Sequence, residues 1–485
     1  MLSLKHFIFY EELRVKLPRF KREYYHGRCM ESAMIIAVSA GQMDWKKDFD
    51  SLRKRMRYLN YGLLGLVTMI NEYSDNEIKM YQAESGVEEL IEDIRVSGAD
   101  LKKDCSYVLL SIPSLYSVSW AAHFCEYLHF NTSTKIIVGG RWAVDGHREW
   151  IAEKLKYADV IIESFGEEKI SSIFELKVST EKRDGARNCF DHFDYSLLYH
   201  YERYSPSIEI SRGCGSGCAF CLDASSKRLK NKSVSLVMKE LDELDKLYKN
   251  DYNVYLEAPH FVFERNWVRE FCEAMKRRRR VVPWRCTTRV ESVPVDMLGE
   301  LAESGLKVID VGLESASLQQ LSQMGKSLNP AGYLKKAETL LKACSEHDIW
   351  VKFNLLLYAG ETVNTVCETA EWLRKNAIFI KDVSVSSLVF YYGMGNLEEL
   401  EALGASVPEG QNIEKTGYIA LNLSNEIKLA DTQRIGHELA CIVANQKDFY
   451  DIKAFSYFEP DYTYEDFLSD LKESNPAILP FCISI

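Results

Sequence analysis

The amino-acid sequence predicts an α/β protein with two parallel sheets and a small α-rich extension at its C-terminal end. Between about residues 30 and 175, short runs rich in β-branched residues alternate with amphipathic stretches, and the alternation restarts at residue 208. A polar, aromatic segment without clear periodicity, residues 183–207, separates the two regions. Because a helix between two strands returns the chain to the same end of a sheet, this alternation favours parallel pairing.

Five runs in the first region have the pattern of buried strands and predict a doubly wound sheet. They are residues 34–40, 77–83, 107–113, 135–140 and 159–164. Ligands of such sheets bind beyond the carboxyl ends of the strands. Two of these ends continue into SIPSLYS (111–117) and VGGRWAV (138–144), where we expect a ligand site.

Six further runs, with helical stretches between them, predict an incomplete parallel barrel, a partial (β/α)6 arrangement whose chemistry lies at the strands' carboxyl ends. They are residues 208–213, 254–259, 281–290, 308–315, 351–360 and 384–393. A helix at 424–445 and an aromatic tail follow, without an assigned fold. The expected segments are an N-terminal extension (1–29), the doubly wound domain (30–175), a linker (176–207), the partial barrel (208–393) and a C-terminal extension (394–485).

Composition predicts a folded cytoplasmic protein that binds neither membrane nor nucleic acid. The chain is 27% charged and 46% hydrophobic, and no run approaches the roughly 18 apolar residues of a membrane span. The N-terminal residues are interrupted by charges and show no cleavage pattern. Net charge is −11, which does not favour nucleic-acid backbones. The basic run at residues 276–280 is interpreted as the solvated end of a helix.

Thirteen cysteines are present, and most are scattered singly among apolar neighbours, which suits reduced thiols rather than a disulfide framework. The scattered ones are Cys29, Cys105, Cys125, Cys189, Cys272, Cys286, Cys344, Cys367, Cys441 and Cys482. Metal-ligand spacing occurs in one group, Cys214, Cys218 and Cys221.

These three cysteines leave the fourth position of a metal site open. A structural zinc site would bring a second cysteine or histidine pair, but none follows, and His200 and His260 are isolated. A C-x3-C-x2-C group directly after a strand instead fits an iron–sulfur cubane with three thiolate-bound irons and one iron free for a small ligand.

The spacing, with Phe220 as the aromatic residue before the last cysteine, resembles the C-x3-C-x-aromatic-C hallmark of radical S-adenosylmethionine (SAM) enzymes. The resemblance implies that Cys214, Cys218 and Cys221 hold a 4Fe–4S cluster whose open iron binds the methionyl group of SAM. It also implies reductive cleavage of SAM to a 5'-deoxyadenosyl radical that abstracts hydrogen from a substrate.

The ends of the following strands extend the resemblance. Glu257 in LEAP would contact the methionyl amine, although the rest of the family's GGE-like element is absent. Arg289 suits the methionyl carboxylate by bidentate pairing. The VGLESAS element implies that Glu314 binds the ribose hydroxyls beside Ser315.

The end of the fifth strand, LLLYAGET, resembles the family's loop near adenine, with Gly360 and Glu361 retained and the proline absent. Each of these residues has a simpler alternative, such as pairing of Arg289 with Glu291 or capping of the next helix by Glu314. Their occurrence in order at successive strand ends favours the shared interpretation.

The first region resembles the cobalamin-binding domain of one radical SAM subclass, through GVEELIEDI, IIVGGRWAV and ADVIIESFGEEKI. This implies a Rossmann-like domain with Ser111, Gly139 and Gly140 at the cofactor. The D-x-H-x-x-G element that supplies an axial histidine elsewhere is replaced by QAESGV (82–87), so cobalamin binding stays open.

Three functions are compatible with this apparatus. The first is cobalamin-dependent C-methylation of a peptide or small natural product, with flavodoxin or ferredoxin as electron donor. The alternative is cobalamin-independent epimerisation, cyclisation or rearrangement, with Cys286 or Cys367 as candidate hydrogen donors and Tyr391 and Tyr392 lining the substrate pocket; packing roles are equally compatible for these residues. The second alternative is a non-catalytic iron–sulfur sensor or assembly partner.

Overall fold

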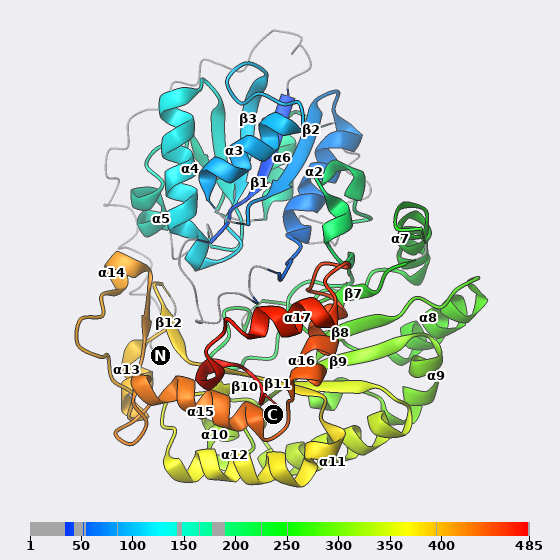
Figure 1. The fold of residues 1–485 in the computed structure, drawn as a ribbon, viewed down its shortest axis with the longest axis vertical. Helices are drawn as coiled ribbons and strands as arrows, with labels where there is room; N and C mark the ends of the chain where they lie inside the picture. The colour runs from blue at the N-terminus through cyan, green and yellow to red at the C-terminus, as the bar shows by residue number, and fades with distance from the viewer. Residues whose placement is uncertain are drawn as a thin grey trace, which may run out of the picture.

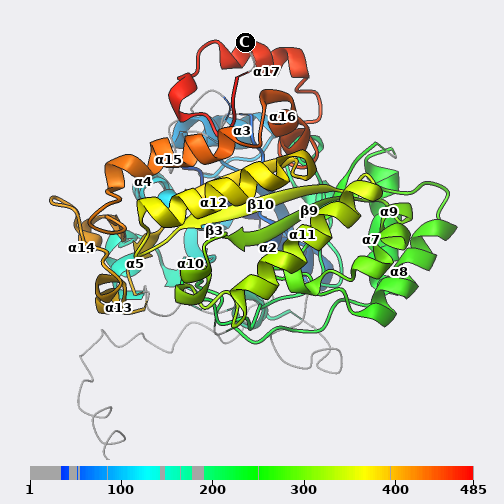
Figure 2. The ribbon, with the colours of Figure 1, turned by 90° about the horizontal axis from the view of Figure 1, so that it is seen from below.

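The computed structural model describes residues 34–483, with the exception of 43–51, 53–54, 85, 143–147, 164, 177–189, 225, 250 and 394. The predicted extension 1–29, Cys29 and Cys189 lie outside the described residues. Figure 1 shows two lobes, with the blue and cyan N-terminal elements above the green and yellow elements of the second lobe. The orange and red C-terminal elements lie against the second lobe (Figures 1 and 2).

The N-terminal lobe contains a five-stranded parallel sheet with the order β2-β1-β3-β4-β5. Its strands are β1 (Met34–Ser39), β2 (Glu77–Gln82), β3 (Cys105–Ser111), β4 (Lys135–Gly139) and β5 (Val160–Ile161). The strand order reverses between β1 and β3, and the loops that leave these two strands diverge. Open sheets of this kind bind their ligands at such a switch point.

Helices cover both faces of this sheet. They are α2 (Tyr61–Tyr73), α3 (Val87–Val96), α4 (Val118–Asn131), α5 (Arg148–Lys154) and α6 (Gly166–Ile173). Because side chains alternate along a strand, Ile35 joins a core with α2 and α6, whereas Ile36 joins a separate core with α3 and α4.

The second lobe contains a six-stranded parallel sheet in sequence order, β6 to β11. Its strands are β6 (Ser207–Glu209), β7 (Val254–Glu257), β8 (Trp284–Thr288), β9 (Leu306–Glu314), β10 (Trp350–Leu357) and β11 (Asp382–Ser387). The connecting helices are α7 (Val234–Leu247), α8 (Arg265–Arg277), α9 (Leu298–Glu303), α10 (Leu318–Gln323), α11 (Pro330–Glu346) and α12 (Val363–Asn376). The prediction of an α/β protein with two parallel sheets is confirmed.

The helical connection between two neighbouring parallel strands is right-handed. When the strands follow one another in sequence order, this handedness places every connecting helix on the same face of the sheet. Trp284 and Cys286 of β8 accordingly pack in the core beneath the helices. Arg285, between them, points the other way and donates from Nε to Asp310 of β9 at 3.0 Å. The face without helices is therefore a polar, concave interior.

The sixth predicted run, residues 384–393, is one strand in the prediction and two in the structure. After Ser387 the chain leaves the sheet, because β10 ends at Leu357 and provides no further partner. β12 (Val389–Tyr391) then pairs antiparallel with β13 (Tyr418–Ala420).

The C-terminal extension closes the open edge of the second sheet, where α15 and α16 pack on β11. Its helices are α13 (Leu397–Ala402), α14 (Ile413–Thr416), α15 (Leu429–Cys441), α16 (Gln446–Ala454) and α17 (Tyr464–Leu471). Aromatic residues of the predicted tail, such as Phe449, Phe458 and Phe467, form a separate small core. The predicted helix at 424–445 corresponds to the shorter α15.

The described part of the connecting segment packs along the first lobe. Tyr199 donates from its backbone N–H to the carbonyl of Met80 at 2.8 Å, and Leu198 forms a parallel bridge with Met80 at the edge of the sheet. Asp194 donates from its N–H to Thr68 Oγ1 of α2 at 2.9 Å. The segment also bonds to the second lobe, where the Tyr195 hydroxyl donates to the carbonyl of Ser207 at 2.8 Å. The connection therefore packs against both lobes.

The basic run at residues 276–280 includes the end of α8, which stops at Arg277. Lys276 forms an ion pair with Glu303, and Arg278 forms one with Asp242 at 2.6 Å. The position at a helix C-terminus is as predicted, but the Arg278 side chain is 8% exposed, so the run is not solvated throughout.

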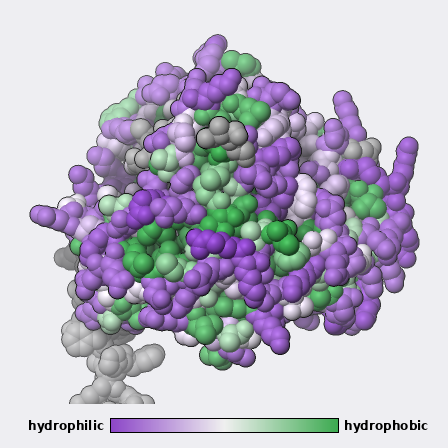
Figure 3. Space-filling model, turned by 60° about the horizontal axis from the view of Figure 1, so that its bottom comes forward, coloured by the Kyte–Doolittle hydropathy of each residue, from purple (hydrophilic) through white to green (hydrophobic). Residues whose placement is uncertain are grey.

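None of the helices formed by the described residues is long and apolar enough to cross a membrane. On the face seen in Figure 3, hydrophilic side chains surround separate hydrophobic patches. Leu328 and Ile378 are the most exposed large apolar side chains among those described. Single exposed apolar residues are common on soluble surfaces and mark no site by themselves.

The Asp310 carboxylate is the ion-pair partner of two buried cations in the concave interior, Arg285 and Lys352. Burial by itself would raise its pKa, but Arg285 and Lys352 outweigh burial and hold the pKa below its ordinary value. Asp310→Asn leaves both buried cations without their partner, and we expect the free energy of unfolding of the apoprotein to fall by about 3–5 kcal/mol. Chemical denaturation measures the change.

The matched control is Asp296→Asn, which breaks an ion pair with Arg265 whose side chains are 64% and 52% exposed. We expect little change there, because solvent screens exposed pairs. Equal losses in the two variants would contradict a special role for the buried pair.

Candidate active site

Three glycines shape the loop that follows β6 and carries the cysteines. Gly213, Gly215 and Gly217 have φ angles of +71°, +71° and +70°, which residues with a Cβ rarely adopt. A Cβ on Gly213 would lie 2.2 Å from the carbonyl oxygen of Lys227. Gly213 is therefore required for the path of the loop, and the positive φ angles favour glycine at the other two positions.

Contacts within this loop, and with the loops that follow other strands, hold it in place. The N–H of Ala219 donates to the carbonyl of Met324 at 2.9 Å, and the N–H of Cys214 donates to Ser226 Oγ at 3.2 Å. The ring of Phe220 lies 6.4 Å from that of Tyr358, directly after β10. The cysteine loop is thus positioned by the loops after β9 and β10.

The three thiols are suited to a cluster rather than to one metal ion. Cys218 is buried, Cys214 and Cys221 are partly exposed, and Cys221 lines a large cavity. Throughout the described residues, no three cysteine, histidine or acidic side chains lie close enough to bind a single ion. In a 4Fe–4S cluster each thiolate binds a different iron and the thiolates lie further apart. Three thiols without a fourth side chain therefore fit a cubane with one open iron.

Arg289 lies directly after β8 and contacts the cysteine loop. Its Nη1 donates to Cys218 Sγ at 3.1 Å and its Nη2 donates to the carbonyl of Lys326 at 2.5 Å, while Nε lies 3.7 Å from Glu291. This contact places the positive charge of the guanidinium beside one of the three cluster thiols. Its contact with a methionyl carboxylate stays a prediction.

Glu257 ends β7 and is enclosed in the concave interior. Its Oε1 accepts a hydrogen bond from Ser207 Oγ of β6 at 3.0 Å. Burial raises its pKa to about 7, although the hydrogen bond from Ser207 opposes the shift. The carboxyl therefore changes its charge near neutral pH.

Glu314 ends β9 in a left-handed conformation, with φ of +68°. Its Oε1 accepts a hydrogen bond from Lys326 Nζ at 2.9 Å, and the two side chains are 12% and 5% exposed. A Cβ on Gly312 would lie 2.5 Å from Glu314 Oε1 and 2.8 Å from Lys326 Nζ, so the glycine of VGLES makes room for the pair. The sequence analysis missed Lys326, because a lysine in a polar loop carries no signal of burial.

Ser315, Gly360 and Glu361 make contacts within the protein. Ser315 Oγ lies 3.1 Å from Thr369 Oγ1 of α12, and the N–H of Gly360 donates to the carbonyl of Leu423 at 2.7 Å. Glu361 accepts a hydrogen bond from Thr365 Oγ1 at 2.5 Å, and burial raises its pKa to about 7. These residues fix the start of α12, and their predicted contacts with SAM stay predictions.

A cavity of about 2100 Å³ lies between the carboxyl edge of the N-terminal sheet and the second lobe. The first lobe contributes Ser111, Gly139 and Gly140 to its lining, and the second contributes Cys221. Pockets for small molecules occupy about 300–1,000 Å³, so this cavity has room for a large cofactor together with a second ligand. No histidine occurs among the described residues that line it.

Asn60 organises the switch point of the N-terminal sheet. It caps α2, where its Oδ1 accepts from the N–H of Leu63 at 3.1 Å. Its Nδ2 donates to Ser39 Oγ and Ser111 Oγ, each at 3.0 Å, so one side chain joins the ends of β1 and β3. Asn60 was not among the predicted site residues; an asparagine before a helical pattern is the signal for its capping role.

Two arginines join the lobes beside the cysteine loop. Arg212 donates from Nε and Nη2 to Glu209 of β6 at 2.7 and 3.0 Å, and from Nη1 to Glu167 of α6 at 2.5 Å. Arg141 donates from Nη2 to Asp223, two residues after the last cysteine, at 2.7 Å. The cluster loop is therefore tied to the N-terminal lobe at both of its ends.

The two candidate hydrogen donors do not line the cavity. Cys286 is fully buried in the core beneath the helices, and burial raises its pKa well above the ordinary value. Arg285, its neighbour, takes the interior position because side chains alternate along β8. Cys367 is exposed on α12. The hydrogen-donor interpretation of both cysteines is therefore not supported.

The two candidate pocket tyrosines lie where the lobes meet. Tyr391 lines the cavity and its ring lies 4.8 Å from that of Trp142 of the N-terminal lobe. The ring of Tyr392 lies 6.3 Å from that of Trp150, and Tyr392 is not part of the cavity lining.

The family profile described as the radical SAM superfamily matches residues 208–373. This segment runs from β6 into α12 and includes the cysteine loop and the strand ends described above. The second lobe therefore carries a radical SAM domain, and the chain is an enzyme whose cofactors include a 4Fe–4S cluster and SAM. None of the curated proteins compared with the chain matches it.

Solved structures share the arrangement of both lobes. The radical SAM methyltransferase TsrM from Kitasatospora setae, with tryptophan substrate and the SAM analogue aza-SAM bound, has a TM-score of 0.59 and 14% identity over 79% of each chain. The cobalamin-dependent radical SAM enzyme OxsB, with aqua-cobalamin and SAM bound, has a TM-score of 0.54 and 16% identity. That match covers 77% of this chain and 55% of OxsB, so the chain spans about half of OxsB.

Gly213 should be needed for cluster assembly. Gly213→Ala and Gly217→Ala place a Cβ at nearly the same φ, but only the first meets backbone, because nothing lies within 4 Å of a Cβ on Gly217. We expect Gly213→Ala to bind roughly half the wild-type iron and sulfide or less after anaerobic reconstitution, since the loop must shift. Gly217→Ala should stay near wild type, and similar losses in both variants would contradict the steric argument.

Glu361 should make stability depend on pH. Its pKa is raised from 4.5 to about 7, so in this window the unfolded chain releases the proton while the folded chain keeps it. Stability therefore falls as pH rises from 4.5 to 7, by up to about 3 kcal/mol from this group. Glu361→Gln should show a smaller fall in denaturant titrations of the apoprotein at pH 5 and pH 7.5. The surface variant Glu371→Gln should keep the wild-type slope, because Glu371 is exposed and does not act on Glu361. A wild-type slope in Glu361→Gln would refute the assignment.

Proposed function

We propose that the protein abstracts a hydrogen atom from a peptide or natural-product substrate and uses cobalamin to methylate the resulting carbon. The observation that carries this proposal is the shared cavity, which brings Cys221 of the cluster loop and the switch-point residues Ser111 and Gly139 to one space. The similarity in fold to TsrM and OxsB supports it, since structures of both contain cobalamin.

The edge of the N-terminal sheet fits a large, flat cofactor. Asn60 holds the hydroxyl groups of Ser39 and Ser111 in place beside the cavity. Gly140 has a φ of +103°, and a Cβ there would lie 2.6 Å from the N atom of Ile112. The turn after β4 therefore packs closely against the backbone that follows β3. None of the described lining residues supplies an imidazole to a corrinoid bound here.

When bound, the cluster and cobalamin would supply an electron for cleavage of SAM and a methyl group for transfer. The residues of the chain would bind and orient the reactants. Arg289 would hold the cluster loop through its contact with Cys218 Sγ, and Glu314, fixed by Lys326, would accept hydrogen bonds from hydroxyl groups of the nucleoside. The two lobes would exclude water from the cavity, and a flavodoxin or ferredoxin would supply the electron.

Epimerisation by a protein thiol is a weaker proposal, because Cys286 and Cys367 lie outside the cavity lining. A cluster scaffold without catalysis would not require the buried Glu314–Lys326 pair at the end of β9. Methyl transfer is therefore the function that the geometry supports best.

The test is formation of 5'-deoxyadenosine from SAM by the anaerobically reconstituted protein with dithionite. We expect wild type to form it and Cys221→Ala to form at least about 100-fold less, because loss of one cluster thiolate removes the reductive step. Absence of deoxyadenosine from wild type that holds a full complement of iron would refute the proposal.

Corrinoid binding separates methylation from hydrogen abstraction alone. After incubation with hydroxocobalamin and gel filtration, wild type should retain close to one corrinoid per chain, measured by its absorption spectrum. Deoxyadenosine formation without corrinoid retention would contradict the methylation step while leaving the radical step intact.

A further inference from the structure

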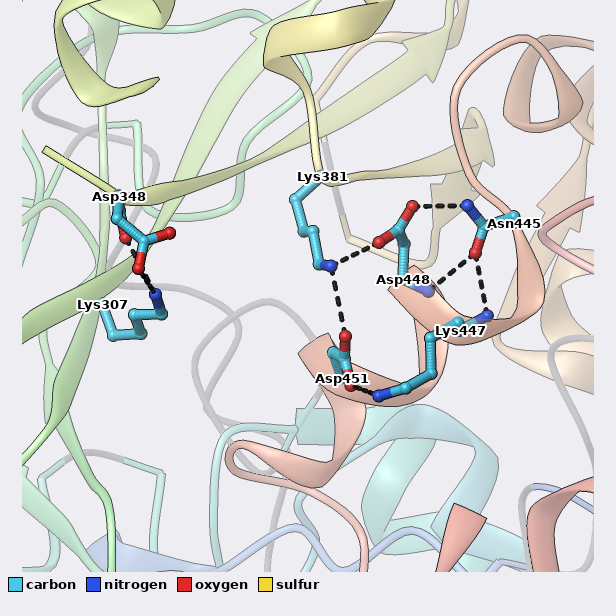
Figure 4. Close-up of polar contacts among 7 residues, drawn as sticks. All are labelled: Lys307, Asp348, Lys381, Asn445, Lys447, Asp448 and Asp451. Carbon is cyan, nitrogen blue, oxygen red and sulfur yellow. Dashed lines mark hydrogen bonds and ion pairs between the residues drawn. The ribbon is translucent and has the colours of Figure 1, made fainter. Parts of the chain in front are cut away.

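Helix α16 closes the open edge of the second sheet and is anchored there by ion pairs. Asn445 caps the helix and accepts from two N–H groups of its first turn, at 2.9 and 3.0 Å. Lys381, the residue before β11, forms ion pairs with Asp448 and, at 3.2 Å, with Asp451 of α16 (Figure 4). The orientation of α16 relative to the sheet is therefore fixed.

This anchoring places Lys453, near the end of α16, in the lining of the large cavity. The residue is 9% exposed, and its Nζ lies 5.3 and 5.2 Å from the ring centres of Phe449 and Tyr457. No side chain or carbonyl of the described residues forms a hydrogen bond or close ion pair with this ammonium. Burial of an unpaired cation is unfavourable, so a ligand that supplies a partner would bind here with a gain in free energy.

The groups around Lys453 include both basic and acidic side chains. Arg285 and Lys352 both pair with Asp310, at 3.0 and 3.3 Å, and so share one carboxylate. The other nearby acid is Asp382, which is buried and whose two oxygens have no hydrogen-bond partner. Burial raises its pKa to about 6 and lowers the pKa of Lys453.

Glu257 also belongs to this network, and burial raises its pKa to about 7. Asp310 is the one of these acids that its neighbours hold firmly ionised. Burial therefore disfavours the charged form of Lys352 and Lys453 as well as that of Asp382 and Glu257. Among the basic groups here, Arg285 and Lys352 pair with Asp310, whereas Lys453 has no carboxylate at ion-pair distance among the described residues, so it is the group left for an anion that enters the cavity.

We propose that Lys453 binds a carboxylate of the substrate, so that the substrate is an amino acid or another small molecule with a free carboxylate. This inference rests on the proposed radical function and names the substrate class for the same cavity. Ser384 and Ser386 of β11 line the cavity as well and provide hydroxyl donors for the same group.

The position of Lys453 relative to strand β8 separates this site from the predicted SAM site. The carbonyl of Ile452, the residue before Lys453, accepts from Arg285 Nη1 at 3.2 Å, and Arg285 is the second residue of β8. Arg289, which contacts the cluster loop, follows the other end of the same strand. A carboxylate held by Lys453 would therefore lie at the far end of the interior and direct the rest of the substrate toward the cysteines.

The experiment compares full-length wild type with Lys453→Met and with Lys447→Met. Lys447 lies on the same helix, is exposed, and pairs with Asp451 outside the cavity. The probes are the twenty protein L-amino acids, each beside its carboxamide, and the readouts are the thermal unfolding midpoint and the rate of deoxyadenosine formation. Without any probe, Lys447→Met should cleave SAM at the wild-type rate and with the wild-type KM for SAM.

We expect at least one acid to bind wild type and Lys447→Met roughly 10- to 100-fold more tightly than its carboxamide, and Lys453→Met to lose this preference. No preference in any pair, or a preference that Lys453→Met keeps, would overturn the proposal. A raised KM for SAM in Lys453→Met would assign the lysine to SAM instead. Because the unfolding midpoint does not require catalysis, a failure of the radical function would appear as missing deoxyadenosine and would be distinguished from failure of this site.

Discussion

The contact on which the arrangement of this protein depends is that of Arg212 with both lobes. Arg212 precedes the cysteine loop by two residues, binds Glu209 at the end of β6 with two hydrogen bonds, and binds Glu167 at the start of α6 with a third. Glu209 also accepts from the N–H of Phe190 in the interlobe connection, at 2.9 Å. A planar guanidinium can satisfy several such acceptors in fixed directions. The place where the cluster loop begins is therefore also the place where the lobes are joined.

The carboxyl edges of both parallel sheets consequently open on the same cavity. In each sheet the loops at this edge carry the groups that are free of strand pairing, so a ligand bound by one lobe lies within reach of the other. The edge of the N-terminal sheet carries hydroxyl groups and a closely packed glycine turn, and the edge of the second sheet carries thiols and charged side chains. A two-cofactor reaction needs such a shared enclosure, which neither sheet would form alone.

The concave interior of the second sheet carries more charge than stability requires. Arg285, Asp310, Lys352 and Lys453 are all buried there, where apolar side chains of similar volume would pack with less desolvation. The C-terminal extension supplies one of these charges and also covers the open edge beside β11. Its role is thus to complete the interior as well as to protect the sheet.

Local patterns determined much of this molecule. The alternation of strand and helix predicted two parallel sheets, because periodicity and crossover geometry act over short stretches of chain. The spacing of Cys214, Cys218 and Cys221 predicted a cluster loop, since three donors in one short loop can bind the same group. The same local reasoning placed Ser111 and Gly139 at a strand's carboxyl end, and both line the cavity.

Other features were decided by tertiary structure alone. The run at 384–393 divides in two because β10 ends and leaves no partner, a fact about a neighbour 30 residues away. Cys286 faces the helices because Trp284, two residues before it on β8, packs against them, and alternate residues of a strand share one face. The sequence by itself determined the class of chemistry, that of a 4Fe–4S cluster with SAM, because the three cysteines that define it are near neighbours in the chain. The place of Lys453 in the cavity lining was decided by folding, because burial and charge pairing join residues as distant in the chain as Lys381 and Asp448.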